Sequence, residues 1–418
     1  MKTPLCLAAL NSFRCFAVVC AIGGLATPSR AALDERIARV ESGLAPRLFV
    51  EGQPIKWSLQ ERMAHYRVPG VSIAVINDGK IEWARGYGTL EAGGSAPVNA
   101  ETVFQAASIS KPVSALAVLR LVEAGKLQLD QDVNEVLKTW KVPANNFTAD
   151  EKVTLRRILS HTAGLTVHGF RGYAEGEAVP SVVQILNGEG PSNSGAIRVD
   201  LKPGKEERYS GGGYVVMHQL MRDVTGEPFE AILQSSVFKP LGMTRSTFVN
   251  DGADIASRHT DIGMPLELGP APSAVNAAAS LVTTAADYGR FVAAAIAGER
   301  LKPETARLML TPQVQLDNCV MCTTRDRAEP SRDLAWGLGW GLEESSEGRV
   351  AWHWGDNGGF KNYVAVLLPA RRGFVYFTNS DSGLSLRDQI VARVLGGTHP
   401  ASRVLDYQQL PGGRQGPS

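Results

Sequence analysis

The stretch that decides the fold is Ser108-Ile109-Ser110-Lys111, which is followed by Pro112 and an apolar run ending at Gly125. Pro112 suits the first turn of a helix, where its missing N–H costs no hydrogen bond, and Gly125 suits the position just past the end. Side chains three residues apart share one helix face, so we expect the Lys111 amine to reach the Ser108 hydroxyl. The spacing predicts a nucleophilic serine activated by a desolvated lysine. The helix N-terminus would favour a developing oxyanion.

Strand patterns lie at both ends of the chain, and helical patterns lie between them. Residues 70–76 and 81–88 predict a hairpin around the turn at residues 77–80. A helix is predicted at 33–48, further strands at 349–354, 362–368 and 373–379, and a closing helix at 384–395. We therefore expect an α+β fold. Its antiparallel sheet combines N- and C-terminal segments and is flanked by helices, and a mainly helical subdomain is inserted at about residues 125–310.

The composition and the N-terminus predict an exported globular protein. The chain has 418 residues, a net charge of +1 and 44% hydrophobic residues, which argues against a nucleic-acid partner. Lys2 and Arg14 precede an apolar core of about a dozen residues, and Ser29 and Ala31 offer small residues for cleavage. Residues 1–31 are thus predicted to be a signal peptide, with a periplasmic or secreted product. The alternative is a single membrane anchor, for which this core is short.

The remaining chain carries no predicted membrane span, and its tail, residues 401–418, is predicted to be flexible. After the leader only Cys319 and Cys322 remain, spaced C-x-x-C. Two cysteines without a nearby histidine do not complete a zinc site, so we predict no zinc at this pair. A local disulfide and a pair of free thiols both stay open.

Two further motifs hold candidate site residues. Arg208-Tyr209-Ser210-Gly211-Gly212-Gly213-Tyr214 places a tyrosine before a glycine-rich helix start, where a phenol near a lysine amine could relay protons. Residues 352–360 place His353 on a strand followed by glycines that would let a substrate backbone approach, and His353 could donate to a substrate carbonyl or carboxylate. The alternative interpretations are a packed aromatic turn and a structural histidine.

These three motifs in this order resemble the serine β-lactamase and penicillin-recognising superfamily. The similarity is to its class C-like branch of esterases and D-peptidases, and residues 155–165 and 240–248 also follow that branch's style. The resemblance implies a hydrolase domain over residues 32–400 that cleaves an ester or amide bond through an acyl-enzyme. It also implies a small-molecule or peptide substrate and neither a metal nor an organic cofactor.

The resemblance assigns roles to residues of the first two motifs. Ser108 matches the acylated nucleophile, and Lys111 matches the amine that helps to deprotonate it. Tyr209 matches the tyrosine that carries a proton to the leaving group and helps to activate the deacylating water. His161 lies in a recurrent loop motif, but packing explains it equally well and it receives no chemical role.

In the third motif, His353 stands where many members have the lysine of K-T-G, and Gly355 matches its glycine. The oxyanion would be bound by the backbone N–H groups of Ser108 and Asp356. Trp354 replaces the usual threonine, and Gly211 replaces the asparagine of Tyr-x-Asn. These departures remove a fixed positive charge and a hydrogen-bonding side chain, which weakens the β-lactam interpretation and favours an ester or peptide.

Three alternatives stay open at the level of sequence: an acyltransferase using the same acyl-enzyme, a weak β-lactamase and a non-catalytic binding relative. The presence of Ser108, Lys111 and Tyr209 counts against the last of these. The sequence predicts neither the substrate nor the oligomeric state.

Overall fold

The computed structural model describes residues 30–45, 56–174, 176–249, 255–266, 274–316 and 332–404. Its helices are α1 (Arg30–Glu41), α2 (Leu59–Tyr66), α3 (Ser110–Glu123), α4 (Val133–Val136), α5 (Leu155–Leu159), α6 (Val182–Asn187), α7 (Gly211–Thr225), α8 (Phe229–Leu233), α9 (Lys239–Leu241), α10 (Ala285–Ala297), α11 (Pro303–Met309), α12 (Arg387–Val394) and α13 (Ala401–Val404). Single turns of 3₁₀ or π helix occur at η1 (Ala107–Ile109), η2 (Gln234–Phe238) and η3 (Gly383–Leu386).

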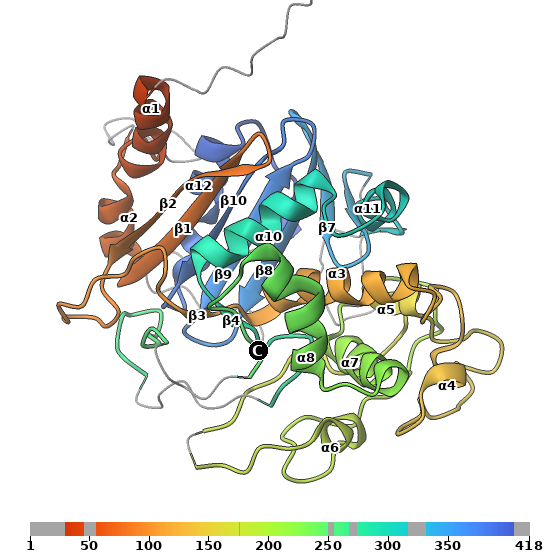
Figure 1. Cartoon of the computed structure of the whole chain (residues 1–418). Coiled ribbons are helices and arrows are strands. Elements are labelled where there is room, and N and C mark those ends of the chain that lie inside the picture. Colours follow the sequence, from red (N-terminus) through yellow and green to blue (C-terminus); the bar gives the residue numbers. More distant parts are fainter. Residues whose placement is uncertain are drawn as a thin grey trace, which may run out of the picture.

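The main sheet is antiparallel and draws on both ends of the chain, as predicted. Its strand order is β2-β1-β10-β9-β8-β7-β6-β5. The strands are β1 (Gly70–Asn77), β2 (Lys80–Gly88), β5 (Val314–Gln315), β6 (Leu334–Trp336), β7 (Gly341–Ser345), β8 (Gly348–Asp356), β9 (Lys361–Leu367) and β10 (Arg372–Thr378), and β3 (Phe104–Gln105) pairs separately with β4 (Val282–Thr283). The N-terminal hairpin joins the C-terminal strands where β1 pairs with β10 (Figure 1).

The sheet separates two hydrophobic cores, which explains why its central strands are apolar on both faces. On β1, Val71, Ile73 and Val75 belong to the core shared with α1, α2 and α12. The alternate residues Ala74 and Ile76 belong to the core shared with α3 and α10. Successive strand side chains point to opposite faces, so a strand buried on both faces has an unbroken apolar sequence.

Helices α3, α5, α7 and α8 form a layer below the sheet, whereas α10 lies across one face of it (Figure 1). Helix α10 lies within the stretch predicted to be the helical subdomain, yet it packs on β1, β2 and β10. Helix α3 is buried on every side from Ser110 to Leu119, as expected of a helix without a polar face. Lys111, on its first turn, is therefore held by a fully packed element.

Both ends of the chain differ from the sequence-based expectation. Helix α1 ends at Glu41, although the predicted helix continues to Leu48, and a side chain at Gly43 would meet the Arg39 carbonyl. Residues 401–404 of the predicted flexible tail form α13, and the buried Ala401 N–H donates to the Glu343 carboxylate over 2.7 Å. A carboxylate at a helix N-terminus stabilises the first turn.

Several predictions fall on residues that lie outside the described ranges. They include residues 1–29 of the predicted signal peptide, Cys319 and Cys322, and residues 405–418 of the tail. Among the helices that are described, none is both long and apolar enough to span a bilayer.

Candidate active site

The candidate nucleophile lies on η1, a tight 3₁₀ turn that leads into α3. Ser108 is predicted to lie where the apolar helix begins, and in the structure it precedes the start of α3 at Ser110 by two residues. Ala107 has φ = 52°, an uncommon conformation for a residue with a side chain. The Ser110 hydroxyl donates to the Ala107 carbonyl over 2.6 Å and thereby fixes this turn. From Thr102 to Leu119 every residue except Ser108 is buried, so the turn presents the serine toward solvent.

Lys111 lies beside this serine, as its spacing predicts. The distance from Lys111 Nζ to Ser108 Oγ is 2.9 Å, and Nζ also donates to the Ala278 carbonyl over 3.1 Å. Burial lowers the pKa of the Lys111 amine well below its ordinary value. Burial therefore favours the uncharged form of the amine, which at this distance is able to accept a proton from the hydroxyl.

A distant segment, residues 277–281, completes the surroundings of the amine. The Ser114 hydroxyl donates to the Ala277 carbonyl over 2.9 Å, and the Leu281 N–H donates to the Ser110 hydroxyl over 3.1 Å. The two serines therefore attach this segment to the start of α3 on either side of Lys111. Sequence reasoning missed the Ala278 carbonyl, because a backbone acceptor carries no side-chain signal.

Tyr209 is buried among aromatic rings close to Lys111. The Lys111 amine lies 4.7 Å from the centroid of the Tyr209 ring. The rings of His161, His168 and Trp354 lie at centroid distances of 4.3, 4.9 and 4.9 Å from it. The structure thus brings the second motif to the first, and it adds two histidines for which the sequence analysis had no role.

The glycines after Tyr209 allow a loop to pack on the start of α7. A side-chain carbon at Gly211 would lie 2.9 Å from the His168 carbonyl, and one at Gly212 would lie 2.4 Å from the Thr166 carbonyl. The Gly211 N–H donates to the His168 carbonyl over 3.0 Å. The loop therefore fills the space that an asparagine at residue 211 would need, which gives a physical reason for the departure noted in the sequence.

His353 lies near the other candidate residues but differs from the predicted substrate donor. Its Nδ1 is 2.7 Å from the Trp354 carbonyl, which can only accept, so the proton is on Nδ1. Its Nε2 is buried and has no hydrogen-bond partner among the described residues. Burial and the neighbouring Lys111 lower the pKa of His353 to about 3. The ring is therefore neutral at pH 7 and offers an acceptor at Nε2.

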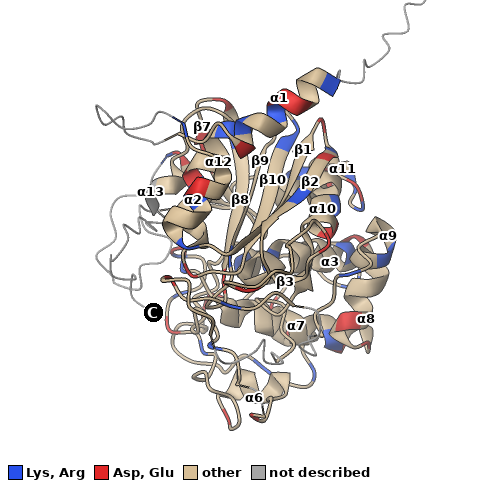
Figure 2. Ribbon diagram, turned by 90° about the vertical axis from the view of Figure 1, so that its left-hand side faces the viewer, with Lys and Arg blue, Asp and Glu red and all other residues tan. Residues whose placement is uncertain are grey.

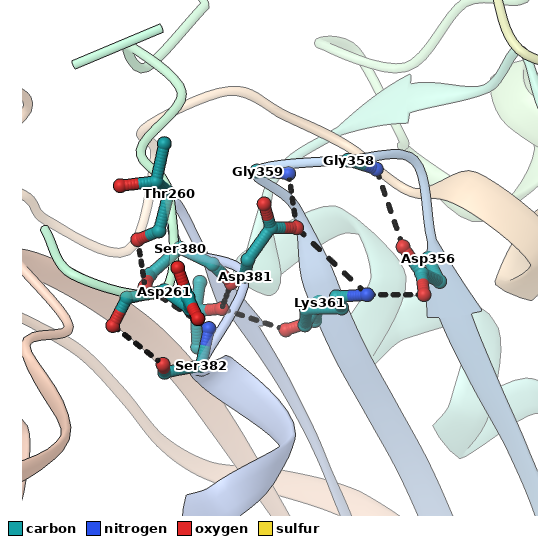
Figure 3. A network of polar contacts seen from close by, with 10 residues as sticks. Thr260, Asp261, Asp356, Gly358, Gly359, Lys361, Ser380, Asp381 and Ser382 are labelled. Carbon is teal, nitrogen blue, oxygen red and sulfur yellow. Dashed lines mark hydrogen bonds and ion pairs between the residues drawn. The ribbon is translucent and has the colours of Figure 1, made fainter. Parts of the chain in front are cut away.

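The end of β8 lies directly against the nucleophile turn. A side-chain carbon at Gly355 would lie 2.4 Å from the Ala106 carbonyl, so only glycine allows this approach. Asp356 follows, and its carboxylate forms an ion pair with Lys361 and accepts from the Gly358 N–H over 3.2 Å (Figure 3). Lys361 also lies 3.8 Å from Asp381. This network anchors the backbone that carries the predicted second oxyanion donor.

The three histidines near Tyr209 are neutral at pH 7. Burial and Lys111 lower the pKa of His161 well below its ordinary value and that of His168 to about 4.

Charged residues lie on the outer helices α1, α2, α8 and α9, whereas β8, β9 and β10 are largely uncharged (Figure 2). The described residues contain no group of three or more His, Cys, Asp or Glu arranged to hold a metal.

Comparison with known proteins identifies the family. A family model described as "Beta-lactamase" matches residues 58–396. The chain belongs to the beta-lactamase family. It is therefore homologous to serine hydrolases of that family, in agreement with the resemblance seen in the sequence.

Individual relatives agree with this membership. Penicillin-binding protein 4 of Amycolatopsis lactamdurans is 26% identical over 346 residues, which are 79% of this chain and 86% of that protein. The octameric penicillin-binding protein homologue from Pyrococcus abyssi superposes with a TM-score of 0.68 at 24% identity, covering 83% of this chain and 77% of that one.

A second solved structure has the same fold. EstCE1, described as a hydrolase with promiscuous acyltransferase activity, has a TM-score of 0.65 at 22% identity and covers 86% of this chain and 98% of its own. These two structural likenesses establish the beta-lactamase fold of the chain.

Proposed function

We propose that this protein hydrolyses an ester or amide bond through an acyl-enzyme formed on Ser108. The observation that carries the proposal is the 2.9 Å contact between Lys111 Nζ and Ser108 Oγ, made by a fully buried amine whose pKa burial lowers. A serine hydroxyl becomes a nucleophile when a neighbour accepts its proton. Burial favours the uncharged form of this amine, and the amine is close enough to accept that proton.

The residues around this pair suit the two halves of the reaction. In the first half, Ser108 Oγ attacks the carbonyl carbon, its proton passes to Lys111, and the leaving group takes a proton by way of Tyr209. In the second half, water attacks the acyl carbonyl carbon and gives up a proton to Lys111 and Tyr209. They return that proton to Ser108 Oγ as its bond to the acyl group breaks, which releases the acid and free Ser108. The N–H groups of Ser108 and Asp356 stabilise the oxyanion in both halves.

The proposed substrate is an ester or peptide in preference to a β-lactam. A β-lactam carboxylate needs a cation, and His353 stays neutral because its pKa is lowered to about 3. We expect the best ester or aminoacyl anilide to be turned over at least about tenfold more efficiently than nitrocefin, which corresponds to about 1.4 kcal/mol. Export, predicted from residues 1–31, is a further proposal from sequence.

Labelling with a fluorophosphonate tests the nucleophile. We expect the intact mass of the wild-type protein to rise by one phosphonyl group, and peptide mapping to place that group on Ser108 rather than on Ser110. Ser108→Ala should not be labelled and should lose at least about a thousandfold in turnover of p-nitrophenyl esters, with an unchanged circular dichroism spectrum. Near-wild-type turnover by folded Ser108→Ala would overturn the proposal.

A further inference from the structure

His161 occupies an unusual position just after α5. Its φ is 58°, in the left-handed region that residues with side chains rarely adopt. It is 2% exposed, and its ring lies 4.9 Å from the Trp336 ring. A buried polar residue in a rare backbone conformation needs a reason, and its contacts with the Tyr209 segment supply one.

His161 accepts two hydrogen bonds, one from the residue before Tyr209 and one from the residue after it. The His161 carbonyl accepts from the Arg208 N–H over 2.7 Å. Its Nδ1 accepts from the Ser210 N–H over 3.1 Å, which places the ring proton on Nε2. One residue therefore fixes the backbone both before and after Tyr209.

The imidazole also fixes the phenol ring itself. The ring centroids of His161 and Tyr209 are 4.3 Å apart, with an interplanar angle of 35°. Ser210, whose N–H donates to His161 Nδ1, is also the N-cap of α7, because its hydroxyl accepts from the Gly213 N–H over 3.0 Å. The orientation of Tyr209 is thus coupled to the loop after α5 and to the start of α7.

We propose that His161 is a positioning residue that holds the Tyr209 phenol in the orientation needed for proton transfer at Ser108 and Lys111. This inference rests on the proposed function. Proton transfer depends steeply on the placement of the donor and the acceptor, so a small rotation of the phenol should slow the reaction. His161 acts through Tyr209 and need not contact the substrate.

The test compares His161→Asn with His161→Gly, each made with Tyr209 intact and with Tyr209→Phe. Asparagine and glycine both tolerate a positive φ, so neither adds backbone strain. Asparagine Oδ1 replaces the Nδ1 acceptor for the Ser210 N–H, whereas glycine removes it. Turnover and KM of a p-nitrophenyl ester are measured for all variants, and thermal unfolding is followed to confirm that each is folded.

With Tyr209 intact, we expect His161→Asn to keep kcat within about threefold and His161→Gly to lose at least about tenfold, with KM little changed. With Tyr209→Phe, the same two substitutions should differ by less than about twofold, because the phenol they place is absent. An equal loss in both backgrounds would indicate a general structural role and overturn the inference.

The outcome also separates this inference from the proposed function. Full kcat in Tyr209→Phe alone would overturn the positioning role, because no phenol would then be needed. The acyl-enzyme on Ser108 would be unaffected by that result, since fluorophosphonate labelling decides it independently. If His161→Gly does not fold, His161→Ala replaces it. The backbone strain that alanine adds at this φ is the same with Tyr209 and with Tyr209→Phe, so it cancels when the two backgrounds are compared.

Discussion

At the scale of single residues, the charge of one amine governs the proposed chemistry. Lys111 must be uncharged to accept a proton, and its surroundings favour that state: it is buried, and the Ala278 carbonyl takes one of its N–H groups. Three neutral histidines surround the nearby phenol, so none of them supplies a positive charge beside Tyr209. The site is thus built to generate a nucleophile and has little to bind an anion.

Substitution of Lys111 distinguishes a base from an electrostatic group. Arginine keeps the positive charge but does not deprotonate in proteins. We therefore expect Lys111→Arg and Lys111→Ala to lose similar activity, at least about a hundredfold in kcat/KM for an ester. If Lys111→Arg kept most of the activity, the positive charge at this position would matter and the ability of Lys111 to accept a proton would not.

The pH profile of the wild-type enzyme tests the same role. Because burial lowers the pKa of Lys111, the neutral form dominates well below the pH at which a free lysine loses its proton. We expect kcat/KM to fall on the acidic side as the amine becomes protonated. Activity that kept rising toward pH 10.5, the ordinary lysine value, would contradict an uncharged base.

At the scale of elements, the site depends on how closely β8 approaches η1. Gly355 is the point of contact, and the Ala106 carbonyl occupies the space that a side chain would need. Asp356 comes next on the strand, so a displacement here moves the backbone N–H that is predicted to bind the oxyanion. The geometry of the site therefore follows from a strand packed against a turn, in addition to the S-x-x-K spacing.

Gly355→Ala should test this approach. The added carbon would meet backbone only 2.4 Å away, so we expect a loss of about 1–3 kcal/mol in unfolding free energy and at least about a tenfold loss of kcat. Gly195→Ala is the matched control, because that position has open space and no positive φ. Denaturant unfolding and ester turnover measure both effects, and equal behaviour of the two variants would contradict the close approach.

These elements also show which parts of the fold could be predicted from the sequence. The hairpin β1–β2 and strands β9 and β10 were predictable, because apolar runs between turn residues report burial on both faces. Strand β7 was missed, since Glu343 is buried through partners near the C-terminus that no local pattern reveals. Likewise, the motif around His161 could be recognised in the sequence, but the hydrogen bond between His161 and Ser210 joins segments that meet only in the folded chain.

At the scale of the whole molecule, hydrogen bonds to the buried Glu343 on the sheet hold residues 399–401 of the C-terminal region in place. The Glu343 carboxylate on β7 is 2.6 Å from His399 Nδ1 and also accepts from the Ala401 N–H. His399 Nε2 lies 2.6 Å from the Gly396 carbonyl, and Asp388 adds a second negative charge nearby. Two nitrogens that both face acceptors are satisfied together only in the doubly protonated imidazolium.

This contact makes part of the stability depend on pH. Burial lowers the pKa of His399, but the Glu343 hydrogen bond and charge outweigh it, so the folded-state pKa is raised above 6.5. The contribution is therefore fully present below about pH 6.5 and is lost as the pH rises through the raised folded-state value. We expect His399→Gln to lower the free energy of unfolding more at pH 6 than at pH 9, by about 1.4 kcal/mol for each unit of pKa shift. Denaturant unfolding at both pH values measures the difference. His65→Gln is the control, because this exposed imidazole has a pKa that burial lowers, so its loss should not cost more stability at pH 6 than at pH 9. A loss for His399→Gln that is equal at the two pH values would mean that the histidine only packs, and that its charge does not help to hold the C-terminal helices on the sheet.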